Sequence, residues 1–259
     1  LKLAFFCVFL MAIGLIITSV SYAKIDPEAL AAMWLFDEKG NQGKDYSGNG
    51  HDGQVLGAVK QVKGKFGDAV EFIGGDSITV PDDEKLNFGV KSFTVVVWLS
   101  FSTAQDWNRL VRERNPSPWG SGNYGWELQT EGVQIHWSLD DKAGNHQRTT
   151  YPDAGNGEWR HTAMIVNREK KMLVSYLDGG DEKTTNIAAI GSVTGELPIV
   201  IGGGFIGSID EVGIFNGILD LDDVTIIMNK GLSETVKKGA AVYTEDKLAA
   251  TWGRMKEAR

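Results

Sequence analysis

Short apolar or alternating segments recur along the chain between turns rich in glycine, asparagine and aspartate. In residues 133–139 apolar and polar side chains alternate, which is the period of a strand with two different faces. Residues 95–99, within the expected strand 93–101, are apolar on both faces, as expected of a strand in the middle of a covered sheet. The pattern predicts an all-β antiparallel sandwich. The expected strands are residues 32–36, 69–73, 77–80, 93–101, 126–129, 133–139, 159–166, 172–177, 197–201 and 208–215.

Helical signals are confined to the C-terminal part of the chain. Asp220 is placed to cap a helix that runs through Met228 and ends at Gly231. A second helix is predicted over residues 244–259, within a C-terminal tail of residues 233–259. Its apolar stripe is expected to dock on the domain's own surface; the alternatives are a C-terminal recognition or sorting signal for export or surface attachment, and a frayed tail.

The first 23 residues form an apolar run followed by small residues, the pattern of a cleaved signal peptide. The mature chain is expected to begin near Lys24, and the protein is expected to be secreted or held at the cell surface; an uncleaved anchor is the alternative. Cys7, the only cysteine, lies inside this run, so the mature domain would form no disulfide.

The composition and the net charge of the chain limit the kinds of partner that it is expected to bind. The chain has 259 residues, 42% of them hydrophobic, and a formal net charge of −8. Such a composition is typical of a globular protein, and residues 24–232 are predicted to form one domain. An acidic chain offers no general basic surface for nucleic acid, and no membrane contact is expected beyond the signal peptide.

Several segments resemble the laminin G-like, concanavalin A-like jelly-roll family of exported bacterial proteins. They are residues 34–38, 45–53, 67–74, 78–81, 92–98, 176–179 and 207–215, the last reading Gly-Ser-Ile-Asp-Glu-Val-Gly-Ile-Phe. In this order they cover residues 32 to about 232. The resemblance implies a two-sheet antiparallel jelly-roll sandwich, with residues 67–74 and 78–81 as a hairpin, and binding of glycans or proteins rather than catalysis.

Motifs of catalysis are missing from the sequence. There is no His-Glu-x-x-His helix and no Gly-x-Ser-x-Gly elbow, so no catalytic residue is predicted. Glu127, Glu131 and the pair Asp140–Asp141 are interpreted as solvated turn charges. Residues 202–207 match Gly-x-Gly-x-x-Gly, but a strand follows where a nucleotide site needs a helix, so a hairpin turn is predicted.

A structural calcium ion is the one cofactor considered, because related jelly-roll domains often hold one. Its candidate ligands are Asp37, Asp45, Asn49 and Asp210. The alternative is that these residues form turns and hydrogen bonds. The neighbour of Asp210 is Glu211, and in a regular strand one of the two would point inward.

Aromatic residues in a polar stretch are the candidates for ligand binding. Trp107, Trp119 and Tyr124 lie among short polar side chains, a mixture suited to sugar rings and hydroxyls, in a region expected to be rich in loops. The sequence therefore predicts a non-catalytic binding domain for carbohydrate or an extracellular protein. The alternative is a glycoside hydrolase or polysaccharide lyase of the same fold with an unrecognised site.

Overall fold

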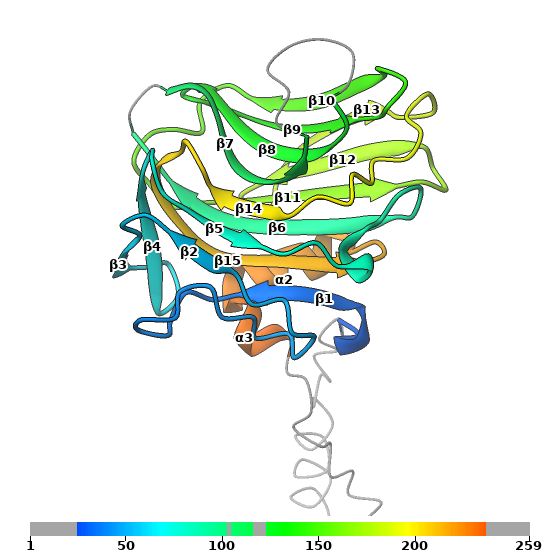
Figure 1. Ribbon diagram of the computed structural model, residues 1–259. Coiled ribbons are helices and arrows are strands. Elements are labelled where there is room, and N and C mark those ends of the chain that lie inside the picture. Colours follow the sequence, from blue (N-terminus) through cyan, green and yellow to red (C-terminus); the bar gives the residue numbers. More distant parts are fainter. Residues whose placement is uncertain (1–24, 103–104, 116–122, 237–259) are drawn as a thin grey trace, which may run out of the picture.

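The computed structural model describes residues 25–102, 105–115 and 123–236, which form two antiparallel sheets packed face to face (Figure 1). Sheet A has the order β13-β12-β11-β6-β15-β4-β3, with β1 paired to β15, and sheet B has the order β10-β9-β8-β7-β14-β5-β2. The predicted all-β jelly-roll class is confirmed.

The strands of sheet A are β1 (Leu30–Trp34), β3 (Lys60–Lys63), β4 (Asp68–Ile73), β6 (Phe93–Ser100), β11 (Arg160–Asn167), β12 (Met172–Leu177), β13 (Asp181–Asn186) and β15 (Ile206–Asn216). Those of sheet B are β2 (Gln54–Leu56), β5 (Ser77–Val80), β7 (Gln105–Arg114), β8 (Gly125–Gly132), β9 (Gln134–Asp140), β10 (His146–Tyr151) and β14 (Ile199–Gly202). The short 3₁₀ helix η2 (Pro27–Ala29) directly precedes β1, and a second one, η3 (Glu84–Leu86), lies between β5 and β6.

Strand β6 lies in the middle of sheet A, between β11 and β15, as its two apolar faces predict. Val95, Val97 and Leu99 point into the core between the sheets, whereas Val96 points to the other face. Burial on both faces requires a second layer outside sheet A.

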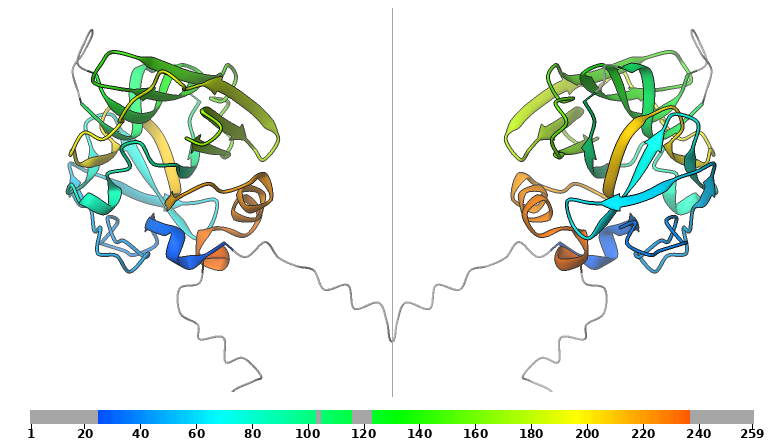
Figure 2. Two further views of the ribbon diagram at one scale, coloured as in Figure 1. Left: turned by 90° about the vertical axis from the view of Figure 1, so that its right-hand side faces the viewer. Right: turned by 90° about the vertical axis from the view of Figure 1, so that its left-hand side faces the viewer.

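That second layer consists of α2 (Leu221–Lys230) and α3 (Leu232–Thr235), drawn in orange beside β1 in Figure 2. Asp220 and Gly231 cap α2 as the sequence predicts. Val224 and Ile227 of α2 join an outer hydrophobic cluster that also contains both ends of the described chain, Ile25 and Val236.

Two turns predicted as hairpins are crossovers between the sheets. Residues 203–205 join β14 of sheet B to β15 of sheet A, and residues 74–76 join β4 of sheet A to β5 of sheet B. The Gly203 N–H donates to the Asp76 carbonyl at 2.9 Å, so the two crossovers support each other. Both hairpin predictions are therefore wrong. The prediction that a strand and not a helix follows the glycines of residues 202–207 is correct.

Five strands were missed by the sequence: β2, β3, β7, β10 and β13. Four of them lie at or next to a sheet edge, where polar residues are common. Strand β7 is the exception, because it lies inside sheet B between β8 and β14. The predicted signal peptide (1–23) and tail helix (244–259) fall outside the described residues, in which no helix is long and apolar enough to cross a membrane.

Candidate binding pocket on the outer face of sheet B

The outer face of sheet B is polar because its strands alternate. On β8, Trp126 and Leu128 enter the core, so Glu127 and Gln129 point the other way. Directly opposite residues on neighbouring antiparallel strands share a face. The side chains of the outer face therefore form rows that run across β7, β8, β9 and β10.

The rows follow from the strand register. The first is Arg114, Gly125, Asp140 and His146; the second is Arg112, Glu127, Ser138 and Arg148; the third is Arg109, Gln129, His136 and Thr150. Gly125 and Ser138 are small and stand near the middle of the first two rows. Their size leaves room for a hollow between longer side chains.

A buried ionic network fixes one side of this hollow. Arg114 forms ion pairs with Glu127 through Nη1 and with Asp140 through Nη2, the latter at 3.0 Å. Arg109 Nε lies 3.1 Å from Glu127 Oε2. Burial raises the pKa of Glu127, and the arginines oppose that shift by stabilising its charge. His146 Nδ1 lies 3.0 Å from Asp140 Oδ1.

Trp107 forms the opposite side. Its ring stacks on His136, with centroids 5.8 Å apart and an interplanar angle of 19°, and 39% of the residue is exposed. The Arg148 guanidinium carbon lies 5.7 Å from the indole centroid, within the range of a cation–π contact. Burial, and then the charge of Arg148, lowers the pKa of His136, which keeps the imidazole neutral at neutral pH.

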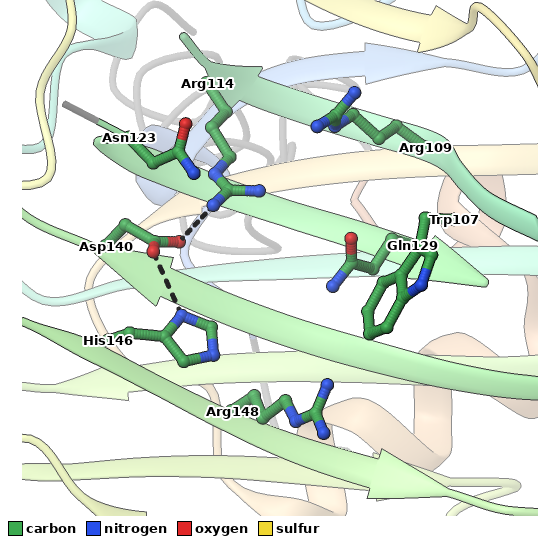
Figure 3. Close-up of a pocket in the computed structure, with 8 residues that line it drawn as sticks. All are labelled: Trp107, Arg109, Arg114, Asn123, Gln129, Asp140, His146 and Arg148. Atoms are coloured by element: carbon green, nitrogen blue, oxygen red, sulfur yellow. Dashed lines mark hydrogen bonds and ion pairs between the residues drawn. The ribbon is translucent and has the colours of Figure 1, made fainter. Parts of the chain in front are cut away.

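These side chains enclose an open pocket of about 300 Å³ (Figure 3). It combines an aromatic ring, guanidinium groups, amides, a carboxylate and an imidazole around one hollow. Its lining residues are Trp107, Arg109, Arg114, Asn123, Gln129, Asp140, His146 and Arg148. We call it the sheet B pocket. A few convergent polar groups beside an aromatic ring are typical of small-ligand sites.

The three predicted ligand-binding residues have different positions. Trp107 lines the sheet B pocket, but it stands on a strand and not in the loop-rich region that the sequence indicated. Tyr124 lies next to the pocket residue Asn123 but does not line the pocket; its ring instead carries Lys142 Nζ at 4.7 Å. Trp119 lies outside the described residues.

Most pocket residues were missed from the sequence. The arginines of β7 and β10 stand in polar segments without apolar alternation, so no strand was expected there. Glu127 was interpreted as a solvated turn charge, which is wrong: it lies within β8, is fully buried and pairs with two arginines. The spacing Arg112-x-Arg114 was the available signal, since i and i+2 on a strand share a face.

Two of the predicted calcium ligands, Asp45 and Asn49, form hydrogen bonds that hold their own loop against β1. Asp45 Oδ1 accepts from the N–H groups of Met33 and Ser47, and its Oδ2 accepts from Ser47 Oγ and the His51 N–H. The Asn49 amide nitrogen donates to backbone carbonyls of β1. Both residues fasten this loop to β1, and the four donors occupy both carboxylate oxygens of Asp45.

The other two predicted ligands lie around the turn of residues 64–67. Asp37 Oδ1 accepts from the Asp68 N–H at 2.7 Å, and Asp210 Oδ2 accepts from the Phe66 N–H at 2.9 Å. Asp210 is fully buried, and its Oδ1 has no partner among the described residues. Among the four predicted ligands, that oxygen is the carboxylate acceptor left for a hard cation, and Asp37 is near enough to affect the pKa of Asp210.

A β-bulge changes the orientation of the neighbouring acid. The register of β15 shifts between Asp210 and Gly213, and Glu211 has a φ of 43°. Both acids are buried because β15 is covered on its two faces, by the core on one and by α2 and α3 on the other. Glu211 Oε2 accepts from the Leu232 N–H of α3 at 3.0 Å. Burial raises the pKa of Asp210 to about 7 and that of Glu211 to about 8. Among the described residues, no three His, Cys, Asp or Glu side chains form a group that could hold a metal.

A family model described as the concanavalin A-like lectin/glucanases superfamily matches residues 72–225. The chain belongs to this superfamily, which confirms the resemblance found in the sequence motifs. A curated relative is the non-toxic nonhemagglutinin type A of Clostridium botulinum, 25% identical over 150 residues. The match covers 56% of this chain and 12% of the relative, so the chain spans about an eighth of the relative's length.

Solved structures with a similar fold are toxin binding domains. The binding domain of Paraclostridial Mosquitocidal Protein 1 has a TM-score of 0.67 at 18% identity, covering 78% of this chain and 52% of that one. The botulinum neurotoxin serotype D ligand binding domain, in complex with N-acetylneuraminic acid, has a TM-score of 0.64 at 16% identity, covering 78% and 51%. At these identities the likeness concerns the fold alone, and this chain matches about half of each structure.

Proposed function

We propose that this chain is a non-catalytic, exported binding module that takes a saccharide in the sheet B pocket. The observation that supports it best is Trp107, whose partly exposed ring stands at the edge of a hollow lined by amide and guanidinium groups. Aromatic rings suit the C–H faces of sugars, and fixed polar groups suit their hydroxyls.

The arrangement of the carboxylates favours binding over hydrolysis. A glycosidase uses two carboxyl groups, one of which has to be protonated to act as an acid. Here both carboxylates are engaged by Arg114, and Glu127 is also paired with Arg109, so neither acid is left free of a counter-ion to act as acid or nucleophile in the hollow. The solved relatives described above are binding domains, which agrees with a binding role.

Export is proposed from the apolar N-terminal run, and a saccharide partner agrees with a fold neighbour that was solved with a sugar acid. An extracellular protein partner is the competing outcome. It would be indicated if a broad glycan panel gave no binding while a surface protein did.

The test is a glycan array followed by calorimetry on residues 24–259, with Trp107→Ala as the key variant. We expect a loss of affinity of about tenfold or more, as for an aromatic anchor. Tyr46→Ala is the matched control, because Tyr46 is 38% exposed and lies on the loop that packs against β1. Equal losses in both variants, or cleavage of the bound glycan, would contradict the proposal.

A further inference from the structure

The outer face of sheet B is rich in arginine in a chain whose formal net charge is −8. Four arginines share this face: Arg109, Arg112, Arg114 and Arg148. Any excess of positive charge here is local, since the chain as a whole is acidic. A cationic hollow in an acidic protein attracts anions to that place alone.

The ion pairs of the face use two of these arginines. Glu127 is paired with Arg109 and Arg114, and Asp140 is paired with Arg114 and approached by His146. Among the described residues, no carboxylate oxygen lies within 4.0 Å of a side-chain nitrogen of Arg112 or Arg148. Two guanidinium groups are thus left without a carboxylate.

Arg148 is the better placed of the two. It lines the pocket, whereas Arg112 does not line it, is half-buried and has its pKa lowered by burial and by Arg109. The contact that places Arg148 is the one with Trp107, which leaves the donors of its planar fork for a ligand. Glu131, the next carboxylate on this face, lies 3.4 Å from His136 Nε2 and forms no ion pair with Arg148.

We infer that the sheet B pocket selects acidic saccharides, binding a carboxylate or sulfate group of the sugar through Arg148 while the sugar ring lies against Trp107. This inference rests on the proposed function and names its ligand class. A guanidinium fork binds carboxylate and sulfate oxygens in pairs, which a neutral hydroxyl does not match. Figure 3 shows Arg148 and Trp107 on the same side of the hollow, and Arg114 turned toward Asp140 on the other.

The test uses pairs of probes that differ in charge. Oligogalacturonate is compared with its methyl ester, 3′-sialyllactose with lactose, and chondroitin sulfate oligosaccharide with unsulfated chondroitin, by calorimetry on residues 24–259. We expect at least one charged member to bind about tenfold tighter than its less charged counterpart, with affinity falling as salt rises. The first two pairs report carboxylate recognition, and the third reports sulfate.

Three variants assign the effect. Arg148→Gln should abolish the preference for the charged member, and Arg148→Lys should restore it in part. Lys170→Ala, an exposed cation in the turn between β11 and β12, should leave it unchanged. Melting curves of all three should superimpose on the parent, since Arg148 is exposed and makes no ion pair.

The outcomes separate this inference from the proposed function. Equal binding of charged and neutral members, still lost in Trp107→Ala, overturns the acidic preference and keeps the saccharide site. A charge preference that survives Arg148→Gln also overturns the inference. Absence of binding to every probe, together with an empty glycan array, overturns both.

Discussion

The two sheets have outer faces of opposite character. On sheet A, the helices α2 and α3 cover an apolar surface, and Val224 and Ile227 are buried there. On sheet B, no helix covers the described strands β7 to β10, and the surface is a row of arginines, acids and amides around a hollow. One outer face therefore adds to the stability of the sandwich, while the other stays open around the sheet B pocket and is held in shape by ion pairs.

The largest effect is expected from Arg114, on the open face. Arg114→Leu leaves the buried Glu127 and the nearly buried Asp140 with fewer counter-charges, and breaking a buried ion pair costs about 3 to 5 kcal/mol. Urea unfolding measures the loss, with Lys170→Ala as control. A cost below about 1 kcal/mol would mean that this network is solvated like a surface pair.

On the closed face, Ile227→Ala should reduce the free energy of unfolding by about 2 to 5 kcal/mol, because it opens a cavity under α2. Ligand affinity at the sheet B pocket should stay unchanged. Ile218→Ala is the matched control, because that side chain is 43% exposed. A change in affinity would show that the two outer faces are coupled.

The next prediction is that calcium stabilises the folded state by binding beside Asp37 and Asp210, away from the sheet B pocket. A cation that binds only the folded state adds about 2.7 kcal/mol at a hundredfold excess over its Kd. The melting temperature should then rise with calcium and fall with chelator, and Asp210→Asn should abolish the difference. Superimposed curves for the parent protein would exclude the predicted ion.

The smallest single step, at most about 1.4 kcal/mol for each pH unit, is expected from a titration on sheet A. Burial raises the pKa of Asp210 to about 7 in the folded state, far above its ordinary value of 3.8. The folded state therefore binds the proton more tightly, and stability should fall as pH rises from about 4 to about 7. One proton gives a slope of at most about 1.4 kcal/mol per pH unit.

The slope is measured by urea unfolding at several pH values. Asp210→Asn should make it shallower, and the residual slope up to about pH 8 should belong to Glu211, whose pKa is raised to about 8. Saturating calcium should flatten it as well, since a cation favours the charged carboxylate. A slope identical in parent and variant would assign it to other groups.

The sequence predicted the fold better than the site, for a physical reason. Strands that bury apolar residues leave a recognisable pattern, with period two in β9 and a continuous apolar run in β6, and α2 carries a capping residue that can be recognised locally. Strand β7 reads Gln-Asp-Trp-Asn-Arg-Leu-Val-Arg-Glu-Arg, with a bulge that breaks its alternation, so its sequence predicts a loop and not a strand. Trp107 was identified by its chemistry, but the strand that carries it was not.

The arginines around the pocket could not be grouped from the sequence for another reason. Arg148 and Arg112 stand at the two ends of one row that crosses four strands, and only the register brings them onto one face. The burial of Asp210 and Glu211 is a similar case, because it depends on the helices that cover the outer face of β15 and not on the local alternation of the strand.

The outer hydrophobic cluster of sheet A also determines where the domain can be fused to another protein, because both ends of the described chain lie in it. Ile25 and Val236 pack in the same cluster, so the described chain enters and leaves at one end of the molecule, while β7 to β10 lie at the other (Figure 1). Ends that meet are what tolerate insertion into the loop of a host or attachment to a stalk. A reporter joined next to Ile25 or Val236 would therefore lie at the end of the domain opposite β7 to β10.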